Sequence, residues 1–279
     1  MKQPALSRTM IVLTIIITSF SGIHAQKKTT SSFDSIPSFR TDSAVTFNYD
    51  VLNLHTIGSG FRDGGRVYTS PIRWTGTDWL KVAVLGGAAV AVHQLDEPIN
   101  NMIHRNSSPF MKGFSSSFEP FGNSLYVIPA LLGTYFYAHA TGKEELSGLT
   151  ITAGKAVIIA NAIATWSKVL AHRHRPYEGT PSKPNQWDGP RADFKNVSFF
   201  SSHTVTAFSL ATVIASTYSD QKWVPYACYS MASLVGISRI TGKDHWATDV
   251  FVGAVVGYGV GKLVYKLNRS KKIKLVVGL

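Results

Sequence analysis

Six long apolar stretches dominate the sequence from residue 80 onward. Each is rich in Ala, Val, Leu, Ile and Gly, and most are too long for an ordinary β-strand. No proline lies inside them except Pro129 and Pro225, which stand near the starts of their stretches. Turn-forming residues follow at 141–143 and 241–243. The pattern predicts α-helices over residues 80–94, 125–140, 147–172, 203–218, 224–240 and 245–267.

The same pattern sets the fold class. The chain has no internal repeat and no alternating strand pattern of any length, so we predict an all-α fold, a bundle of about six helices with the active site at one end. A hydrophobic share of 44 % excludes a disordered chain, and a single cysteine, Cys228, excludes a disulfide scaffold. We expect residues 79–268 to form the helical domain.

The two ends of the chain differ from this domain. A positively charged start and the apolar stretch Met10–Phe20 precede the small residue Ala25, which is the layout of a secretory signal peptide. We predict a signal peptide over residues 1–25, with an uncleaved anchor helix as the alternative. Residues 26–78 are expected to be a linker and an irregular N-terminal region, and residues 269–279 a basic tail.

The first cluster of charged residues lies at the end of the third apolar stretch. Arg175 follows Lys168 by seven residues, about two turns of a helix, so both cations are expected on one side of it. Pro176 disfavours helix at the residue before it, so the helix should end near Arg175. The two cations can bind the oxygens of a dianion. The alternative is that they only compensate the negative end of the helix dipole.

The second cluster, Ser201, Ser202 and His203, opens the fourth apolar stretch. Serine is a favoured N-cap, and the unpaired amides of a first helical turn bind phosphate readily. His203 would then point at the anion that those amides hold. The alternative is an ordinary capped helix with an incidental histidine.

The third cluster contains Arg239, His245 and Asp249. Because His245 and Asp249 are four residues apart on one predicted helix, the carboxylate can accept a hydrogen bond from the imidazole. That bond would fix the tautomer and leave the other ring nitrogen as a nucleophile or base. A structural His–Asp pair is the alternative. Two histidines at helix starts, together with three cations, favour a catalytic site for an anionic substrate.

The three clusters resemble the three-part signature of the type 2 phosphatidic acid phosphatase and vanadium haloperoxidase superfamily. Their order along the chain matches, and so do the spacings inside the first part, Lys168 to Pro176, and the third, Ser238 to Asp249. The second part departs from the usual Pro-Ser-Gly-His, because this chain has Phe200-Ser201-Ser202-His203. The resemblance covers the six apolar stretches and leaves the first 78 residues unexplained.

The resemblance implies a metal-independent histidine phosphatase without a cofactor. His245 would attack phosphorus and become a phosphohistidine, Asp249 would orient His245, and His203 would donate a proton to the leaving alcohol. The phosphate-binding residues that it implies carry a positive charge or a hydroxyl group, and they are Lys168, Arg175, Arg239, Ser201 and Ser202.

The resemblance further implies hydrolysis of phosphate esters. The net charge of +12, with a charged share of only 16 %, favours lipid phosphates among them. A soluble periplasmic acid phosphatase for nucleotides or sugar phosphates is the alternative, followed by a vanadate-dependent haloperoxidase and a non-catalytic anion-binding envelope protein. We expect no nucleic-acid partner, because the chain lacks a basic patch with interleaved aromatic residues. We expect export to the cell envelope, a periplasmic-facing site and membrane association, with integral and soluble forms both open.

Overall fold

The structure is a computed structural model that describes residues 45–49, 51–177, 183–195 and 197–271. The predicted signal peptide, part of the predicted linker and most of the predicted basic tail lie outside the described residues. Within them the chain is an all-α bundle, as predicted, with one small two-stranded sheet.

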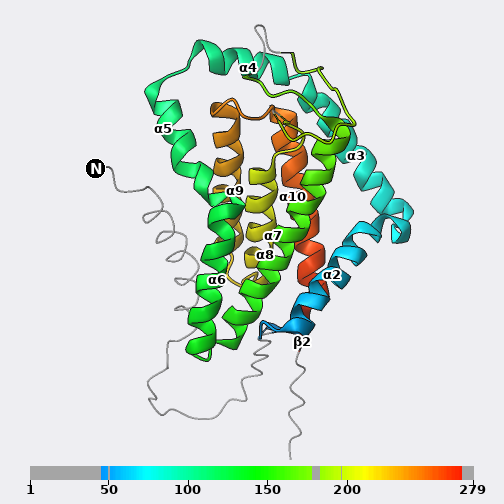
Figure 1. Ribbon diagram of the computed structural model, residues 1–279, viewed down its shortest axis with the longest axis vertical. Coiled ribbons are helices and arrows are strands. Elements are labelled where there is room, and N and C mark those ends of the chain that lie inside the picture. The colour runs from blue at the N-terminus through cyan, green and yellow to red at the C-terminus, as the bar shows by residue number, and fades with distance from the viewer. Residues whose placement is uncertain (1–44, 50, 178–182, 196, 272–279) are drawn as a thin grey trace, which may run out of the picture.

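All six predicted helices are present. Helices α6 to α10 run side by side along the long axis of the molecule, with α8 packed against α7, α9 and α10 (Figure 1). Nearly every residue of α8 is buried, so this helix forms the core of the bundle. The six helices are α3 (Gly76–His93), α6 (Ser124–Ala140), α7 (Glu144–Ala171), α8 (Ser202–Thr217), α9 (Trp223–Thr241) and α10 (Ala247–Asn268).

Three further α-helices lie outside the predicted ones. The expectation of an irregular region before residue 78 is wrong for α2, because Asn53 caps that helix by accepting a hydrogen bond from the amide of Thr56 at 2.9 Å. The additional helices are α2 (Leu54–Tyr68), α4 (Asp96–Arg105) and α5 (Pro109–Phe118), with short 3-10 helices η1 (Ser70–Arg73) and η2 (Glu119–Phe121).

Helix α2 is amphipathic, but its polar face is buried and its apolar face is exposed, the opposite of a surface helix on a water-soluble protein. Its buried face carries Thr56, Ser59 and Asp63, whereas Leu54 and Phe61 are 87 % and 80 % exposed. Helix α3 extends this apolar surface, since none of its residues is buried. Exposed apolar surface of this extent is typical of a protein that contacts lipid or another partner.

A buried polar cluster fastens α2 to the bundle. Nζ of Lys155 on α7 lies 2.6 Å from Oγ of Ser59, 3.3 Å from Oδ2 of Asp63 and 2.7 Å from Oδ1 of Asn268 on α10. The amide group of Asn268 in turn donates to Oδ2 of Asp63 at 2.9 Å. Because these groups satisfy one another, the polar face of α2 can be buried against α7 and α10.

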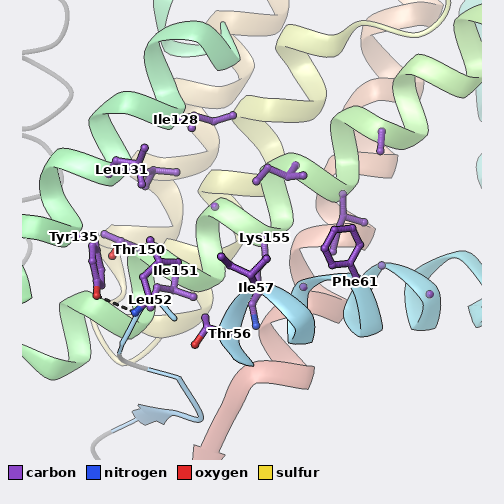
Figure 2. Close-up of a pocket in the computed structure, with 18 of the residues that line it drawn as sticks. Leu52, Thr56, Ile57, Phe61, Ile128, Leu131, Tyr135, Thr150, Ile151 and Lys155 are labelled. Atoms are coloured by element: carbon purple, nitrogen blue, oxygen red, sulfur yellow. Dashed lines mark hydrogen bonds between the residues drawn. The ribbon is translucent and has the colours of Figure 1, made fainter. Parts of the chain in front are cut away.

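An apolar groove of about 490 Å³ lies between α2, α6 and α7 (Figure 2). Ile57 and Phe61 of α2 line one side of it, and Ile128 and Leu131 of α6 line the other. None of the predicted site residues lines this groove. The chemistry predicted from the sequence therefore lies elsewhere in the fold.

The small sheet joins the two ends of the described chain. Strand β1 (Val45–Phe47) pairs antiparallel with β2 (Arg269–Lys271), and Thr46 stands opposite Ser270. The first residues of the predicted basic tail are therefore paired with the segment before α2.

Close packing of α8 and α10 depends on three glycines of α10. They are Gly253, Gly257 and Gly261, at intervals of about one turn. A Cβ atom at any of these positions would lie within 3.0 Å of a backbone oxygen of α8 or its cap. Because α8 and α10 begin at the same end of the bundle, their close approach sets the two helix starts beside each other.

Two helices of the described chain, α7 and α10, are long and apolar enough to cross a bilayer. Helix α7 is largely enclosed by its neighbours, whereas most of the corresponding stretch of α10 is not buried.

Candidate active site

The predicted site residues gather at one end of the bundle, where α7 and α9 end and α8 and α10 begin (Figure 1). Hydrogen bonds and ion pairs among these helix ends and residues 172–177 and 197–201 hold them together. The structure thus brings together residues that the sequence separates into three clusters, namely Lys168, Arg175, Ser201, Ser202, His203, Arg239, His245 and Asp249.

Lys168 lies in the last turn of α7, but Arg175 is not on that helix, contrary to the prediction. The helix ends at Ala171, because His172 adopts a left-handed conformation with φ 40° while its amide still bonds the carbonyl of Lys168 at 2.9 Å. The two cations nevertheless meet at the backbone oxygen of Val197, which lies 3.3 Å from Nζ of Lys168 and 3.2 Å from Nε of Arg175.

His245 lies in the turn before α10, and Asp249 lies in the first turn of that helix. Their predicted direct hydrogen bond is absent, because Nδ1 of His245 is 3.8 Å from Oδ2 of Asp249. The hydroxyl group of Ser198 lies 3.3 Å from that Nδ1 and donates a hydrogen bond to Oδ2. All three side chains are buried.

The second carboxylate oxygen of Asp249 is held by Arg173, whose side chain is fully buried. Nη1 of Arg173 lies 2.6 Å from Oδ1 of Asp249, and Nη2 lies 2.6 Å from Oδ2 of Asp96 at the start of α4. The guanidinium group also lies against the rings of Trp187 and Trp246. One buried cation thus pairs with two buried carboxylates and fixes the orientation of Asp249.

Arg239, in the last turn of α9, lies near Glu119 and His203. Its Nη1 is 3.6 Å from Oε2 of Glu119, whose Oε1 is 3.7 Å from Nε2 of His203. These distances are too long for hydrogen bonds. Among the described residues, Nε and Nη1 of Arg239 and Nε2 of His203 are buried without a hydrogen-bond partner. Such nitrogen atoms are suited to the oxygens of a bound anion.

Ser201 is the N-cap of α8, as predicted, and its Oγ accepts a hydrogen bond from the amide of Thr204 at 3.4 Å. Its own amide donates to the backbone oxygen of Asp249 at 3.1 Å, which links the starts of α8 and α10. Ser202 is the first residue of α8, and its side chain is half-buried. The first turn of α8, which contains His203, therefore lies next to the first turn of α10, which contains Asp249.

The electrostatics of the site favour a neutral nucleophile. Burial lowers the pKa of His245 to about 3, because the imidazolium form would lose its hydration, although Asp249 acts in the opposite direction. The nearby imidazole of His203, assisted by Arg239, lowers the pKa of Glu119 to about 2. At neutral pH, His245 therefore keeps a free ring nitrogen, and Glu119 is an anion.

Four residues in contact with the predicted site were missed by the sequence analysis: Ser198, Arg173, Asp96 and Glu119. Arg173 stands between the two cations of the first cluster, and that position is the signal that could have singled it out. Ser198 has no local pattern of its own. Asp96 and Glu119 belong to segments far from the three clusters, so only the fold brings them to the site.

Residues 149–273 match the sequence profile of the PAP2 superfamily. Over 72 residues the chain is 48 % identical to a lipid A 1-phosphatase of Porphyromonas gingivalis, a match that covers 25 % of this chain and 16 % of that relative. The chain thus aligns with only a small part of the length of this curated relative.

Two solved structures resemble the fold. LpxE of Aquifex aeolicus has 22 % identity and a TM-score of 0.44, with 62 % of this chain and 95 % of that chain covered. A transmembrane PAP2 type phosphatidylglycerolphosphate phosphatase of Bacillus subtilis has 22 % identity and a TM-score of 0.46, with 68 % and 90 % covered.

The profile match contains all three clusters, from Lys168 to Asp249. It also contains Arg173 and Ser198, which surround Asp249 in the structure. Residues 149–273, a little under half of the chain, are thus similar to the PAP2 superfamily, and all of the predicted site residues lie among them.

Proposed function

We propose that this protein is a membrane-associated phosphatase that hydrolyses lipid phosphate esters through a phosphohistidine formed on His245. The observation that carries the proposal is the set of buried nitrogen atoms on Arg239 and His203 that have no hydrogen-bond partner among the described residues. Lys168 and Arg175 add two further cations at the same end of the bundle. Cations placed in advance around a phosphoryl group stabilise the charge on its three equatorial oxygens.

In the proposed first step, Nε2 of His245 attacks phosphorus. A nitrogen–phosphorus bond forms while the bond from phosphorus to the ester oxygen breaks. The protonated imidazole of His203 gives its proton to the leaving alkoxide, which departs as an alcohol. Nδ1 of His245 keeps its proton throughout, so the phosphorylated ring carries a positive charge that Asp249 stabilises.

In the second step, His203 acts as the base. It removes a proton from a water molecule, whose oxygen attacks the phosphorus of the phosphohistidine. The nitrogen–phosphorus bond breaks, the electron pair returns to Nε2 of His245, and inorganic phosphate is released. His203 is left protonated for the next cycle, so protons and atoms balance over both steps.

Lipid phosphates are favoured as substrates for two reasons. The short stretch with 48 % identity belongs to a relative named for its action on lipid A. The apolar outward face of α2, the unburied helix α3 and the unburied side of α10 supply a surface suited to a bilayer. We propose that the bundle is embedded in the membrane with its site end at the outer surface.

The membrane part of the proposal is tested by an alkaline carbonate wash of isolated membranes. We expect the protein to stay in the pellet, because apolar contacts with lipid survive high pH whereas electrostatic contacts are lost. Release into the supernatant would contradict the embedded form and leave a peripheral or soluble one.

The chemistry is tested with the full chain in detergent micelles. Phosphate release is measured from lipid A, phosphatidate, a prenyl diphosphate, a nucleotide and a sugar phosphate under one condition. We expect hydrolysis of one or more of the lipid substrates, and an acid-labile phosphoenzyme in the wild type that His245→Ala lacks. Equal rates for the two proteins would refute the mechanism, and a preference for the soluble esters would refute the substrate class.

A matched control for these variants is Ser209→Ala on α8. Ser209 is buried like the site residues, but its Oγ donates to the carbonyl of Thr206 in its own helix, at 3.1 Å. We expect this variant to retain the activity of the wild type. A similar loss in both variants would point to a general disturbance of the fold.

A further inference from the structure

The His245–Asp249 pair is not in direct hydrogen-bond contact. Nδ1 of His245 and Oδ2 of Asp249 are 3.8 Å apart, and the hydroxyl group of Ser198 stands between them. Ser198 and Asp249 have no exposed surface, and His245 is 3 % exposed, so no bulk water reaches this contact. The hydroxyl group can serve both neighbours, because it donates one hydrogen bond and accepts others.

We propose that Ser198 couples Asp249 to His245 and is a positioning residue for the nucleophile, an inference that rests on the proposed function. Nδ1–H of His245 donates to Oγ of Ser198, whose hydroxyl proton is donated to Oδ2 of Asp249. This order of donors fixes the proton on Nδ1 and leaves the lone pair on Nε2 for phosphorus. Through the same two hydrogen bonds, the negative charge of Asp249 stabilises the positive charge of the ring once that ring is phosphorylated.

Asp249 cannot easily take over this contact, because both of its oxygens are held. Oδ1 accepts from Nη1 of Arg173 at 2.6 Å, and Oδ2 accepts from the amide of Trp246 at 2.9 Å. Arg173 is itself fixed by Asp96. A carboxylate held on two sides keeps its place, so the gap to His245 has to be filled by another side chain.

The backbone of Ser198 is fixed as firmly as its side chain. Its amide donates to the carbonyl of Arg173 at 2.7 Å, and its own carbonyl lies 3.4 Å from Nζ of Lys168. The residue thus sits between a cation of the proposed phosphate site and the Arg173 contact to Asp249. A serine in this position needs no change of backbone or rotamer to bridge His245 and Asp249.

The test is a double-mutant cycle on the full chain in detergent micelles, with Ser198→Ala, Asp249→Asn and the combination of both. If Ser198 acts through Asp249, Ser198→Ala lowers kcat by about 10- to 100-fold in the wild type, the cost of losing a hydrogen bond to a charged group. In the Asp249→Asn background, Ser198→Ala lowers kcat by less than about threefold. Equal losses in both backgrounds would overturn the proposal.

A second readout separates positioning from a general structural effect. Because the phosphate-binding cations are untouched, KM and the inhibition constant of inorganic phosphate are expected to stay within about twofold of the wild type. A rise in KM with an unchanged kcat would contradict the proposal. If Ser198→Ala does not fold, Ser198→Thr carries the test, since it keeps the hydroxyl group: activity near that of the wild type supports the coupling, and a folded but inactive protein overturns it.

Failure of the proposed function and failure of this inference give different experimental outcomes. A wild type that forms no phosphoenzyme and releases no phosphate from any ester overturns the proposed function and this inference together. An active wild type whose rate is unchanged by Ser198→Ala overturns only the role of Ser198. Ser209→Ala, the buried serine of α8, is expected to leave kcat unchanged in both backgrounds.

Discussion

Oδ2 of Asp244 lies 2.5 Å from Nη2 of Arg239, so a carboxylate of the chain itself neutralises a cation of the proposed phosphate site. Oδ1 of the same residue is 3.6 Å from Nη1 of Arg175. An incoming phosphate therefore has to compete with Asp244 for two guanidinium groups. This competition weakens the binding of substrate and of product phosphate alike.

We predict that Asp244→Asn strengthens phosphate binding. The amide keeps the shape of the side chain but removes its charge, so the inhibition constant of inorganic phosphate is expected to fall by about five- to tenfold. Asp188→Asn is the control, because Asp188 pairs with His174 instead of the site cations. Weaker phosphate binding in Asp244→Asn would show that Asp244 is needed to hold Arg239 in place.

Arg239→Lys is predicted to lower kcat/KM by about 100-fold. Lysine retains the charge, but it cannot reproduce the separate Nε and Nη1 donors that lie buried without partners in the described structure. Steady-state kinetics with the best lipid substrate measure the effect, and the exposed Arg66→Lys on α2 serves as control. Full activity of Arg239→Lys would mean that charge alone is required there.

Asp63→Asn is predicted to destabilise the fold by about 3 kcal/mol, because it leaves the buried ammonium group of Lys155 without its carboxylate. Chemical unfolding in detergent micelles measures this loss. The exposed pair of Asp78 and Lys81 provides the control, and Asp78→Asn is expected to destabilise the fold much less than Asp63→Asn does. Equal losses would mean that Asp63 contributes no more than a surface charge.

The stability of the protein is predicted to fall with acid through His245. Its folded-state pKa of about 3 lies below the value of about 6.5 for an unfolded histidine, so between these values the unfolded chain binds a proton that the folded chain does not. The free energy of unfolding therefore decreases as pH falls through this window, by up to about 1.4 kcal/mol per pH unit. His245→Asn lacks this contribution.

The measurement compares unfolding free energies at several pH values for the wild type and His245→Asn. The exposed His55→Asn controls for loss of a histidine elsewhere and is expected to keep the acid dependence of the wild type. Parallel curves for the wild type and His245→Asn would contradict the lowered pKa of His245.

The helices of the bundle could be predicted because apolar periodicity reports burial against other helices. This rule does not hold for helix α2, because its inward face carries Ser59 and Asp63 and its outward face carries Phe61. Only the partners Lys155 and Asn268, distant in the sequence, explain why that polar face is buried. A pattern that assumes an apolar core cannot orient such a helix.

The candidate site was predictable as three clusters, because helix caps and fixed spacings leave local traces in the sequence. The spacing of His245 and Asp249 correctly predicts that the two side chains lie close together, but the direct hydrogen bond that it also predicts is wrong, because the two atoms are 3.8 Å apart. The side chain that fills the gap, Ser198, comes from a different segment. The shared helix predicted for Lys168 and Arg175 failed for a related reason, since His172 ends α7 early.

The buried cluster around Lys155 has a consequence for biosynthesis. Asn268 lies 113 positions after Lys155 and 205 after Asp63, so the last turn of α10 leaves the ribosome long after α2 and α7. Until then, the amide that bonds both charged side chains is missing. The N-terminal helix α2 can therefore reach its final packing only when the far end of the domain has been made, which ties the earliest helix of the described chain to the latest event in its assembly.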